Sequence, residues 1–390
     1  MKKFLLIFSA ITVFIIIPIA LSFAWIISPK TNDYPFYGDE KLKAAASNNF
    51  KVQSGDGVSR SNNSTGTPIL EKKEPVTITF CAMGDISLGG FFGKRIYFNT
   101  VFEQNGAKYF LQNLSPYLND SDFNTANLES VFTDSTNPLP GKIYSYKSGS
   151  KNFADILSSH NIMYLNVVNN HMQDYRQAGF DESIQFLEQK GFKPFGTNLM
   201  DCSDPELGSV KVDKTQIFEK DGFKVGMLGF YAFASSYPTE DVIKQRVAEL
   251  KKSGCDFILA HMHGGGQETY QVLQPQIENA YKLIDCGVDL VLGAHPHALQ
   301  KTEYYKGRKI YYSLGNFLFP NYRSSSFPET ILVKATLTKS PDGNVTAKYE
   351  NIPVLWTGIY SGNTYVPAVI GNENIKNKIR NILKDSDPVL

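Results

Sequence analysis

The sequence predicts an α/β domain, because short apolar segments alternate with amphipathic segments along most of the chain. Two Asp-Gly pairs, Asp221-Gly222 and Asp342-Gly343, are typical of hairpin turns. Because a hairpin places its two strands antiparallel, we expect mixed sheets. Polar clusters also follow directly after several apolar segments, as they do where an α/β sheet carries a ligand site.

The expected strands are apolar, and the expected helices lie between the earlier ones. The strands are Val76–Met83, Asp122–Ala126, Ile162–Val168, Phe223–Phe230, Asp256–Ala260, Val288–Leu292, Lys309–Ser313, Thr330–Thr338 and Val345–Ile352. The helices include Gly179–Lys190, Asp241–Lys252 and Gln274–Cys286. A chain of 390 residues that is 42% hydrophobic can bury a sizeable core around these elements.

Charge and cysteine content exclude several function classes. The chain has 39 Lys+Arg and 38 Asp+Glu, so it has no basic field for phosphate neutralisation and we expect no nucleic-acid partner. Its four cysteines are scattered and form no Cys-x-x-Cys pair, which argues against zinc-ribbon and thioredoxin-like sites.

The N-terminus predicts a membrane anchor over residues 1–30. Lys2 and Lys3 precede an apolar run from Phe4 to Ile27, which at ~1.5 Å per helical residue can cross a ~30 Å hydrocarbon layer. The lysines place the N-terminus in the cytoplasm and the remaining chain outside. A cleaved signal peptide is the alternative, although the run exceeds the usual apolar length of ~7 to 15 residues. We therefore expect a single-pass protein of the cell membrane with an extracytoplasmic C-terminal domain.

Residues 31–75 have the composition of a flexible polar linker. They are rich in Asn, Ser, Gly and Lys and lack hydrophobic periodicity. The globular domain is accordingly expected over residues 76–390.

Chemically reactive side chains gather where the expected strands end. The clusters are Gly84-Asp85-Ile86-Ser87, Asn127-Leu128-Glu129, Asn169-Asn170-His171 with Asp174, His261-Met262-His263, His295-Pro296-His297 and Asn316. Because ligands bind beyond the carboxyl ends of strands in open α/β sheets, we expect these side chains to converge.

Five of the six histidines lie in these clusters; the exception, His160, is expected to be a solvated loop residue. Imidazoles combined with carboxylates and an amide oxygen suit a divalent transition metal (Mn, Zn or Fe) better than calcium. The sequence thus predicts a site for one or two such ions, in which a carboxylate can bridge the pair.

In order and spacing these motifs resemble those of the CapA family of poly-γ-glutamate capsule synthesis proteins. The resemblance covers about residues 76–360 and includes the segment Tyr312-Ser313-Leu314-Gly315-Asn316-Phe317. It implies a calcineurin-like metallophosphoesterase fold: a four-layer sandwich of two mixed sheets flanked by helices, with a metal centre at the strand ends.

The resemblance also implies residue roles. Asp85 and His297 would ligate a first metal, Glu129 would bridge, and Asn170, His263 and His295 would ligate a second metal. His171 matches the histidine that protonates a leaving group in metallophosphoesterases, with Asp174 as the carboxylate beside it.

Two features depart from the pattern. Metallophosphoesterases begin with Asp-x-His, but Ser87 stands at the third position, which weakens the expected first site. The doublet His261 and His263 leaves two candidates for one ligand. Counted along the expected strand from Asp256, the position of the family's single histidine falls on His263, which is therefore favoured. Asn127, Glu268 and Asn316 are further candidates for contact with metal or substrate.

The resemblance implies a membrane-anchored protein of poly-γ-glutamate or envelope-polymer biosynthesis. We expect a metal-dependent hydrolase or transferase that uses metal-activated water and acts on an anionic polymer, with membrane synthase or export partners. The alternative is a non-catalytic envelope component that assists export or assembly of such a polymer.

Overall fold

The computed structural model describes residues 74–91, 97–142, 144–199, 210–233, 237–320, 325–384 and 386–390. These residues lie within one compact unit of the chain. The predicted anchor and nearly all of the predicted linker fall outside the described residues. Within the described ranges, every helix is too short or too polar to span a bilayer.

Most strands belong to one mixed sheet. Its main path runs in the order β12-β13-β11-β10-β9-β6-β5-β3-β1-β15-β16-β19, with β14 paired to β1, β7 to β6 and β8 to β9. The strand bounds are β1 (Val76–Ile86), β3 (Phe123–Leu128), β5 (Ile162–Asn166), β6 (Lys193–Asn198), β7 (Val212–Lys214), β8 (Gln216–Lys220), β9 (Phe223–Tyr231), β10 (Phe257–His263), β11 (Leu290–Ala294), β12 (Thr302–Tyr305), β13 (Arg308–Tyr311), β14 (Asn316–Leu318), β15 (Glu329–Lys339), β16 (Val345–Leu355) and β19 (Ala368–Val369).

The mixed pairing confirms the expectation from the Asp-Gly turns. The neighbours β1, β3, β5 and β6 run parallel, as do β9, β10, β11 and β13, whereas β15 pairs antiparallel with both β1 and β16. The two expected mixed sheets are the two halves of one continuous path among the described strands. A single residue pair, Thr197 with Phe230, joins β6 to β9 and connects the two halves into one path.

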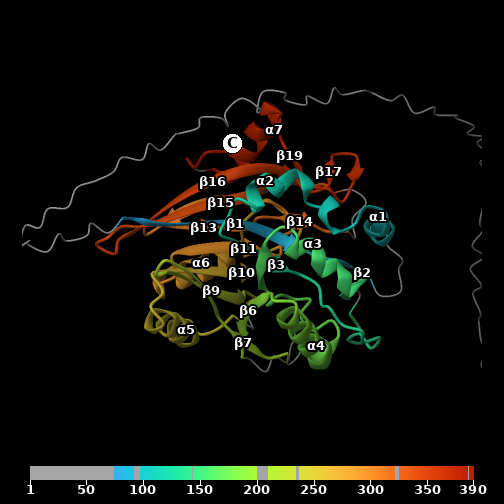
Figure 1. Cartoon of the computed structure of the whole chain (residues 1–390), viewed down its shortest axis with the longest axis horizontal. Helices are drawn as coiled ribbons and strands as arrows, with labels where there is room; N and C mark the ends of the chain where they lie inside the picture. Colours follow the sequence, from blue (N-terminus) through green and yellow to red (C-terminus); the bar gives the residue numbers. More distant parts are fainter. Residues whose placement is uncertain are drawn as a thin grey trace, which may run out of the picture. The chain divides into compact units, whose positions relative to one another are not determined.

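This sheet curls so that its halves pack face to face. One buried cluster contains Phe80 of β1 and Phe123 of β3 together with Met227 of β9, Leu259 of β10 and Leu292 of β11. In Figure 1, β1 crosses the middle of the view, with β15 and β16 above it and β9 and β10 below it. Burial of this shared apolar interior holds the two halves of the sheet together.

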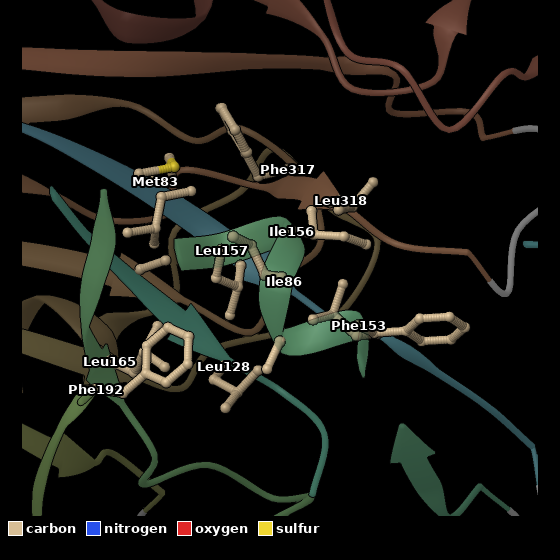
Figure 2. Packing of buried hydrophobic residues seen from close by; sticks show 14 of the residues in the cluster. Met83, Ile86, Leu128, Phe153, Ile156, Leu157, Leu165, Phe192, Phe317 and Leu318 are labelled. Atoms are coloured by element: carbon tan, nitrogen blue, oxygen red, sulfur yellow. The ribbon is translucent and has the colours of Figure 1, made fainter. Parts of the chain in front are cut away.

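Helices cover the outward faces of both halves. The helices are α1 (Tyr97–Asn105), α2 (Ser115–Leu118), α3 (Ala154–Ser158), α4 (Arg176–Gln189), α5 (Glu240–Lys252), α6 (Gln274–Asp285) and α7 (Glu373–Leu383). Figure 2 shows Ile156 and Leu157 of α3 beside Ile86 of β1 and Leu128 of β3. On the other half, a third cluster joins α5 and α6 to β9, β10 and β11.

Local sequence explains the boundaries of these elements. The Thr239 side chain accepts a hydrogen bond from the Val242 amide and begins α5, whose first turn is acidic and whose last turn is basic. Asp221 and Gly222, with φ of 50° and 75°, form the two-residue turn between β8 and β9. Asp342-Gly343 lies in the longer connection between Lys339 and Val345. The three expected helices are confirmed as α4, α5 and α6.

Candidate metal centre

The predicted site residues come from the carboxyl ends of parallel strands. Asp85 is the penultimate residue of β1, Glu129 directly follows β3, and His263 is the last residue of β10. His295 and His297 follow β11, and Asn170 and His171 lie in the connection after β5. The topology therefore gathers residues that are more than 200 positions apart in the sequence, such as Asp85 and His295, whose backbone amide donates to Asp85 Oδ2 over 3.1 Å.

A close backbone approach fixes the position of Asp85. The Asp85 amide donates to the Gly315 carbonyl over 2.9 Å. A Cβ added to the preceding residue, Gly84, would lie 1.9 Å from that same carbonyl oxygen. Only glycine fits here, because any side chain would push β1 away from the segment that leads into Asn316.

Four donor atoms define one candidate metal position. His263 Nε2 lies 2.9 Å from Asn170 Oδ1, 3.2 Å from His295 Nδ1 and 3.7 Å from Glu129 Oε1. All four side chains are at least nine-tenths buried. Two imidazoles, an amide oxygen and a carboxylate form a donor set that suits a divalent transition ion.

A second candidate position shares Glu129. Asp85, Glu129 and His297 each offer a ligand atom, and these atoms lie within 4.8 Å of one another. His297 Nδ1 lies 2.9 Å from Asn316 Oδ1 and 3.4 Å from Asp85 Oδ2, and His297 Nε2 lies 3.9 Å from Glu129 Oε1. Asn316, at the start of β14, therefore orients an imidazole of this group.

Ser87 does not supply the ligand that the Asp-x-His pattern would place in this second group. Its hydroxyl lies 3.4 Å from both the amide and the carbonyl of Gly89, and its own amide donates to the Leu318 carbonyl. The group with Asp85 thus has three protein donors, and the group with Asn170 has four.

The surroundings of the Glu129 carboxylate show whether these residues fit a metal. Its side chain is fully buried, and neither carboxylate oxygen has a hydrogen-bond partner among the described residues. Burial, followed by the charge of Asp85, raises the pKa of Glu129 well above 4.5. An unpaired buried carboxylate costs several kcal/mol, and a bound cation removes that cost.

The histidines are suited to ligation. Burial, and then the neighbouring histidines, lowers the pKa of both His263 and His295 well below 6.5. Both rings are therefore neutral at physiological pH, and each keeps a nitrogen lone pair. The buried charges of the site also favour a bound cation. Asp85, Glu129 and Asp174 are fully buried, and among the described residues Lys142 is the only lysine or arginine paired with any of them.

The His295-Pro296-His297 turn holds an unusual backbone. Its two histidines have positive φ, 97° and 56°, which non-glycine residues rarely adopt. Neighbouring hydrogen bonds maintain the turn: the Glu268 amide donates to the Pro296 carbonyl over 2.8 Å, and the Gly264 amide to the Ala294 carbonyl over 3.0 Å. The turn directs His295 into the group that contains Asn170 and His297 into the group that contains Asp85.

His171 lies beside the donor groups and is oriented by Asp174. His171 Nδ1 is 2.7 Å from Asp174 Oδ2, and His171 Nε2 is 3.8 Å from Glu129 Oε1. Burial lowers the pKa of His171, and the adjacent Asp174 carboxylate opposes that effect. The ring therefore presents Nε2 toward the cluster, which is the orientation that proton transfer at the centre requires.

Lys142 completes this arrangement and was not predicted from the sequence. Its ammonium lies 2.5 Å from Asp174 Oδ1 and also donates to the Asn170 carbonyl. The Tyr146 amide donates to Asp174 Oδ2 over 2.5 Å. A lysine in the loop before β4 (Tyr146–Ser148) carries no motif that distinguishes it from a solvent-exposed lysine.

A chain of side-chain amides holds the Asp85 carboxylate in place. Asn127 Nδ2 donates to Asp85 Oδ1 over 2.8 Å, and Asn166 Nδ2 donates to Asn127 Oδ1 over 2.8 Å. Asn169 Nδ2 also reaches Asn127 Oδ1, at 3.3 Å. Asn127 thus lies behind a donor rather than in either donor group. Asn169, from a cluster named in the sequence, is a supporting residue, and so is Asn166, which the sequence did not single out.

His261 and Glu268 lie outside both donor groups. His261 is two residues earlier on β10, which places it ~7 Å deeper in the sheet. There its Nε2 lies 3.0 Å from Thr125 Oγ1, and burial lowers its pKa to about 3. Glu268 is exposed on the loop after β10 and has a φ of 50°.

The expectation that His160 is a solvated loop residue is wrong. His160 is 1% exposed, and its Nδ1 lies 2.9 Å from the Ile156 carbonyl of α3. The ring folds back onto the end of its own short helix, and burial lowers its pKa.

With this geometry established, the family is identified by comparison with known sequences. The family model of the bacterial capsule synthesis protein PGA_cap matches residues 79–321, a span that contains every donor named above. The chain belongs to the PGA_cap family. The family match and the convergence of the predicted ligands concern the same stretch of the chain.

Named relatives are similar over much of their length. The PGA biosynthesis protein CapA of Bacillus subtilis is 27% identical over 82% of this chain and 82% of its own. The capsule biosynthesis protein CapA of Bacillus anthracis is 26% identical over 64% of this chain and 62% of its own.

Solved structures show more distant likenesses. A phosphatase of Mycoplasma pneumoniae matches 72% of this chain and 94% of its own at 15% identity, with a TM-score of 0.43. The sulfate thiohydrolase SoxB of Thermus thermophilus matches 78% of this chain and 60% of its own at 11% identity, with a TM-score of 0.41. Both likenesses are too distant to add to the family assignment.

Proposed function

We propose that this protein is a metal-dependent hydrolase or transferase that acts on an anionic envelope polymer, with poly-γ-glutamate as the first candidate. The observation that carries the proposal is the buried, unpaired carboxylate of Glu129 between two groups of nitrogen and oxygen donors. A divalent transition metal held by these donors supplies Lewis-acid chemistry and lowers the pKa of water. The polymer is suggested by the family and by the printed names of the two CapA relatives.

Different residues of the chain would hold the metal ions, transfer the proton and position the side chain that transfers it. Asn170, His263 and His295 with Glu129 would hold one ion, and Asp85 and His297 with Glu129 would hold a second. His171, oriented by Asp174, presents Nε2 toward the cluster and would give a proton to the leaving group. Lys142 keeps Asp174 in place through a buried ion pair.

We further propose that residues 1–30 anchor the protein in the cell membrane, with the catalytic domain outside the cytoplasm and close to membrane synthase or export partners. The support is the apolar run behind Lys2 and Lys3. Protease treatment of intact spheroplasts should degrade the domain, whereas a domain degraded only after lysis would contradict this topology.

A non-catalytic role in polymer export or assembly is the second candidate. The position of Ser87, whose hydroxyl faces Gly89, favours it, because the Asp85 group is left with three protein donors. Such a site could bind a metal for structure or for polymer contact without turnover.

The deciding experiment uses the full-length protein purified in detergent. It is incubated with poly-γ-glutamate and Mn, Zn or Fe, and polymer length is followed by size-exclusion chromatography. We expect metal-dependent change in chain length that is lost in His171→Ala and kept in His160→Ala, a buried histidine outside the centre. Polymer that is bound but unchanged supports the second candidate, and absence of both binding and change contradicts the link to this polymer.

A further inference from the structure

A cavity lies beside the loop that leaves the metal centre. Its volume is about 630 Å³, and it is bounded by the segment from Tyr270 to Val272, by Ile277 of α6 and by one face of α7. None of the metal donors lines it. Lining residues of α7 include Asn374, Asn377 and Asn381, which recur at helical spacing and form a row of side-chain amides along the helix.

These amides are available for ligand contacts. Within the described residues, the side chains of Asn374 and Asn381 make no hydrogen bond, and Asn377 uses only its oxygen, which accepts from Arg380. Primary amides pair well with the N–H and C=O groups of another polypeptide backbone. The apolar part of the lining, Val272, Ile277 and Ile382, can contact methylene groups.

Within the described part of the chain, the charged side chains that line the cavity are all lysines. Lys301 is paired with Glu303 at 3.1 Å, and Lys378 is paired with the buried carboxylate of Glu329 at 2.5 Å. Lys384, the exposed C-terminal cap of α7, has no ion-pair partner among the described residues. Among the described residues, a ligand that carries carboxylates therefore meets one ammonium without an ion-pair partner and no lining carboxylate.

Hydrogen bonds connect this cavity to the metal centre. The buried Gln300 side chain donates to the carbonyls of Thr269 at 3.0 Å and Gln271 at 2.9 Å, and so fixes the cavity wall. The same loop begins at His263 and touches the His295-Pro296-His297 turn through the Glu268 amide. The nine residues that follow His263 and end at Val272 in the cavity wall span at most ~30 Å. A polymer held in the cavity can therefore also reach the metal centre.

We propose that this cavity binds a short stretch of an acidic polypeptide, with the amide row contacting the polymer backbone and Lys384 contacting a carboxylate. From Asn374 to Lys384 the helix rises ~15 Å, the length of about four extended α-linked residues. The inference rests on the proposed function for its substrate class, and it adds a holding site away from the reacting bond.

The test measures polymer binding by the full-length protein at low ionic strength with two fluorescein-labelled probes, an oligo-γ-glutamate and an oligo-α-glutamate. The test variant combines Lys384→Glu with Asn381→Ala. The control variant is Lys252→Glu, which changes an exposed lysine at the end of α5. We expect the double variant to raise Kd about tenfold and the Lys252 variant to change it less than twofold. The stronger probe identifies which linkage the cavity prefers.

Hydrogen–deuterium exchange locates the probe and keeps the test independent of variant folding. Bound polymer should slow exchange in residues 269–277 and 373–384, and it should do so equally in His263→Ala, whose metal centre is impaired. Equal Kd for both variants, protection confined to residues 127–142 and 169–174, or no binding of either probe would overturn the proposal. Polymer cleavage measured separately reports on the proposed function, so the two can fail independently.

Discussion

Asn127 Nδ2 donates a 2.8 Å hydrogen bond to Asp85 Oδ1, and Asn127 receives in turn a hydrogen bond from Asn166. A residue that looked like a candidate ligand in the sequence is therefore a support for one. Partners of this kind commonly change metal affinity by ~10- to 100-fold when they are removed. The hydrogen bond from Asn127 holds the Asp85 carboxylate in one orientation.

Asn127→Ala should weaken the metal position that contains Asp85 by about tenfold, because Asp85 loses its orienting donor. The position that contains Asn170 should keep its affinity. Calorimetric titration with Mn(II) measures both, and Asn105→Ala, on α1 and away from the centre, is the control. Unchanged affinity in the Asn127 variant would show that the hydrogen bond does not position Asp85.

Lys142→Met should lower the free energy of unfolding by about 3 kcal/mol, because it leaves the fully buried Asp174 carboxylate without its ion-pair partner. Urea denaturation measures the change. Lys244→Met removes an exposed pair with Glu240 and should lower the free energy of unfolding much less than Lys142→Met does. Equal, small losses in both variants would mean that the Lys142 pair contributes nothing.

The burial of His160 predicts a pH-dependent contribution to stability. Its folded pKa is lowered, so the unfolded chain binds more protons as the pH falls through 6.5, and stability falls with it. The stability advantage of the wild type over His160→Gln should therefore be smaller at pH 5 than at pH 8. Urea denaturation at the two pH values tests this, and an advantage that grows at pH 5 would contradict it.

Much of the fold could be predicted because its strands are short apolar segments bounded by polar residues. The expected strands agree with β1, β3, β5, β9, β10, β11, β13, β15 and β16 within a few residues. The continuity of the sheet could not be predicted, since it depends on one strand-paired residue pair, Thr197 with Phe230, which no local pattern reveals.

The site was predictable in so far as its residues sit at strand ends, where topology forces convergence. Asp85, Glu129, Asn170, His263, His295 and His297 do converge in the structure. Their supports were harder to predict. Lys142 lies in a polar loop and Thr125 inside a strand, so nothing in their local sequence shows that one pairs with Asp174 and the other with His261.

The central claim is that His263, and not its neighbour His261, belongs to a metal centre. The two histidines lie on one strand, are both buried and are two residues apart, so each is the control for the other. Elemental mass spectrometry of the full-length protein should find one or two transition ions per chain in the wild type and in His261→Ala, and fewer in His263→Ala. Equal metal content in the two variants, or no metal in the wild type after reconstitution with Mn or Zn, would contradict the account.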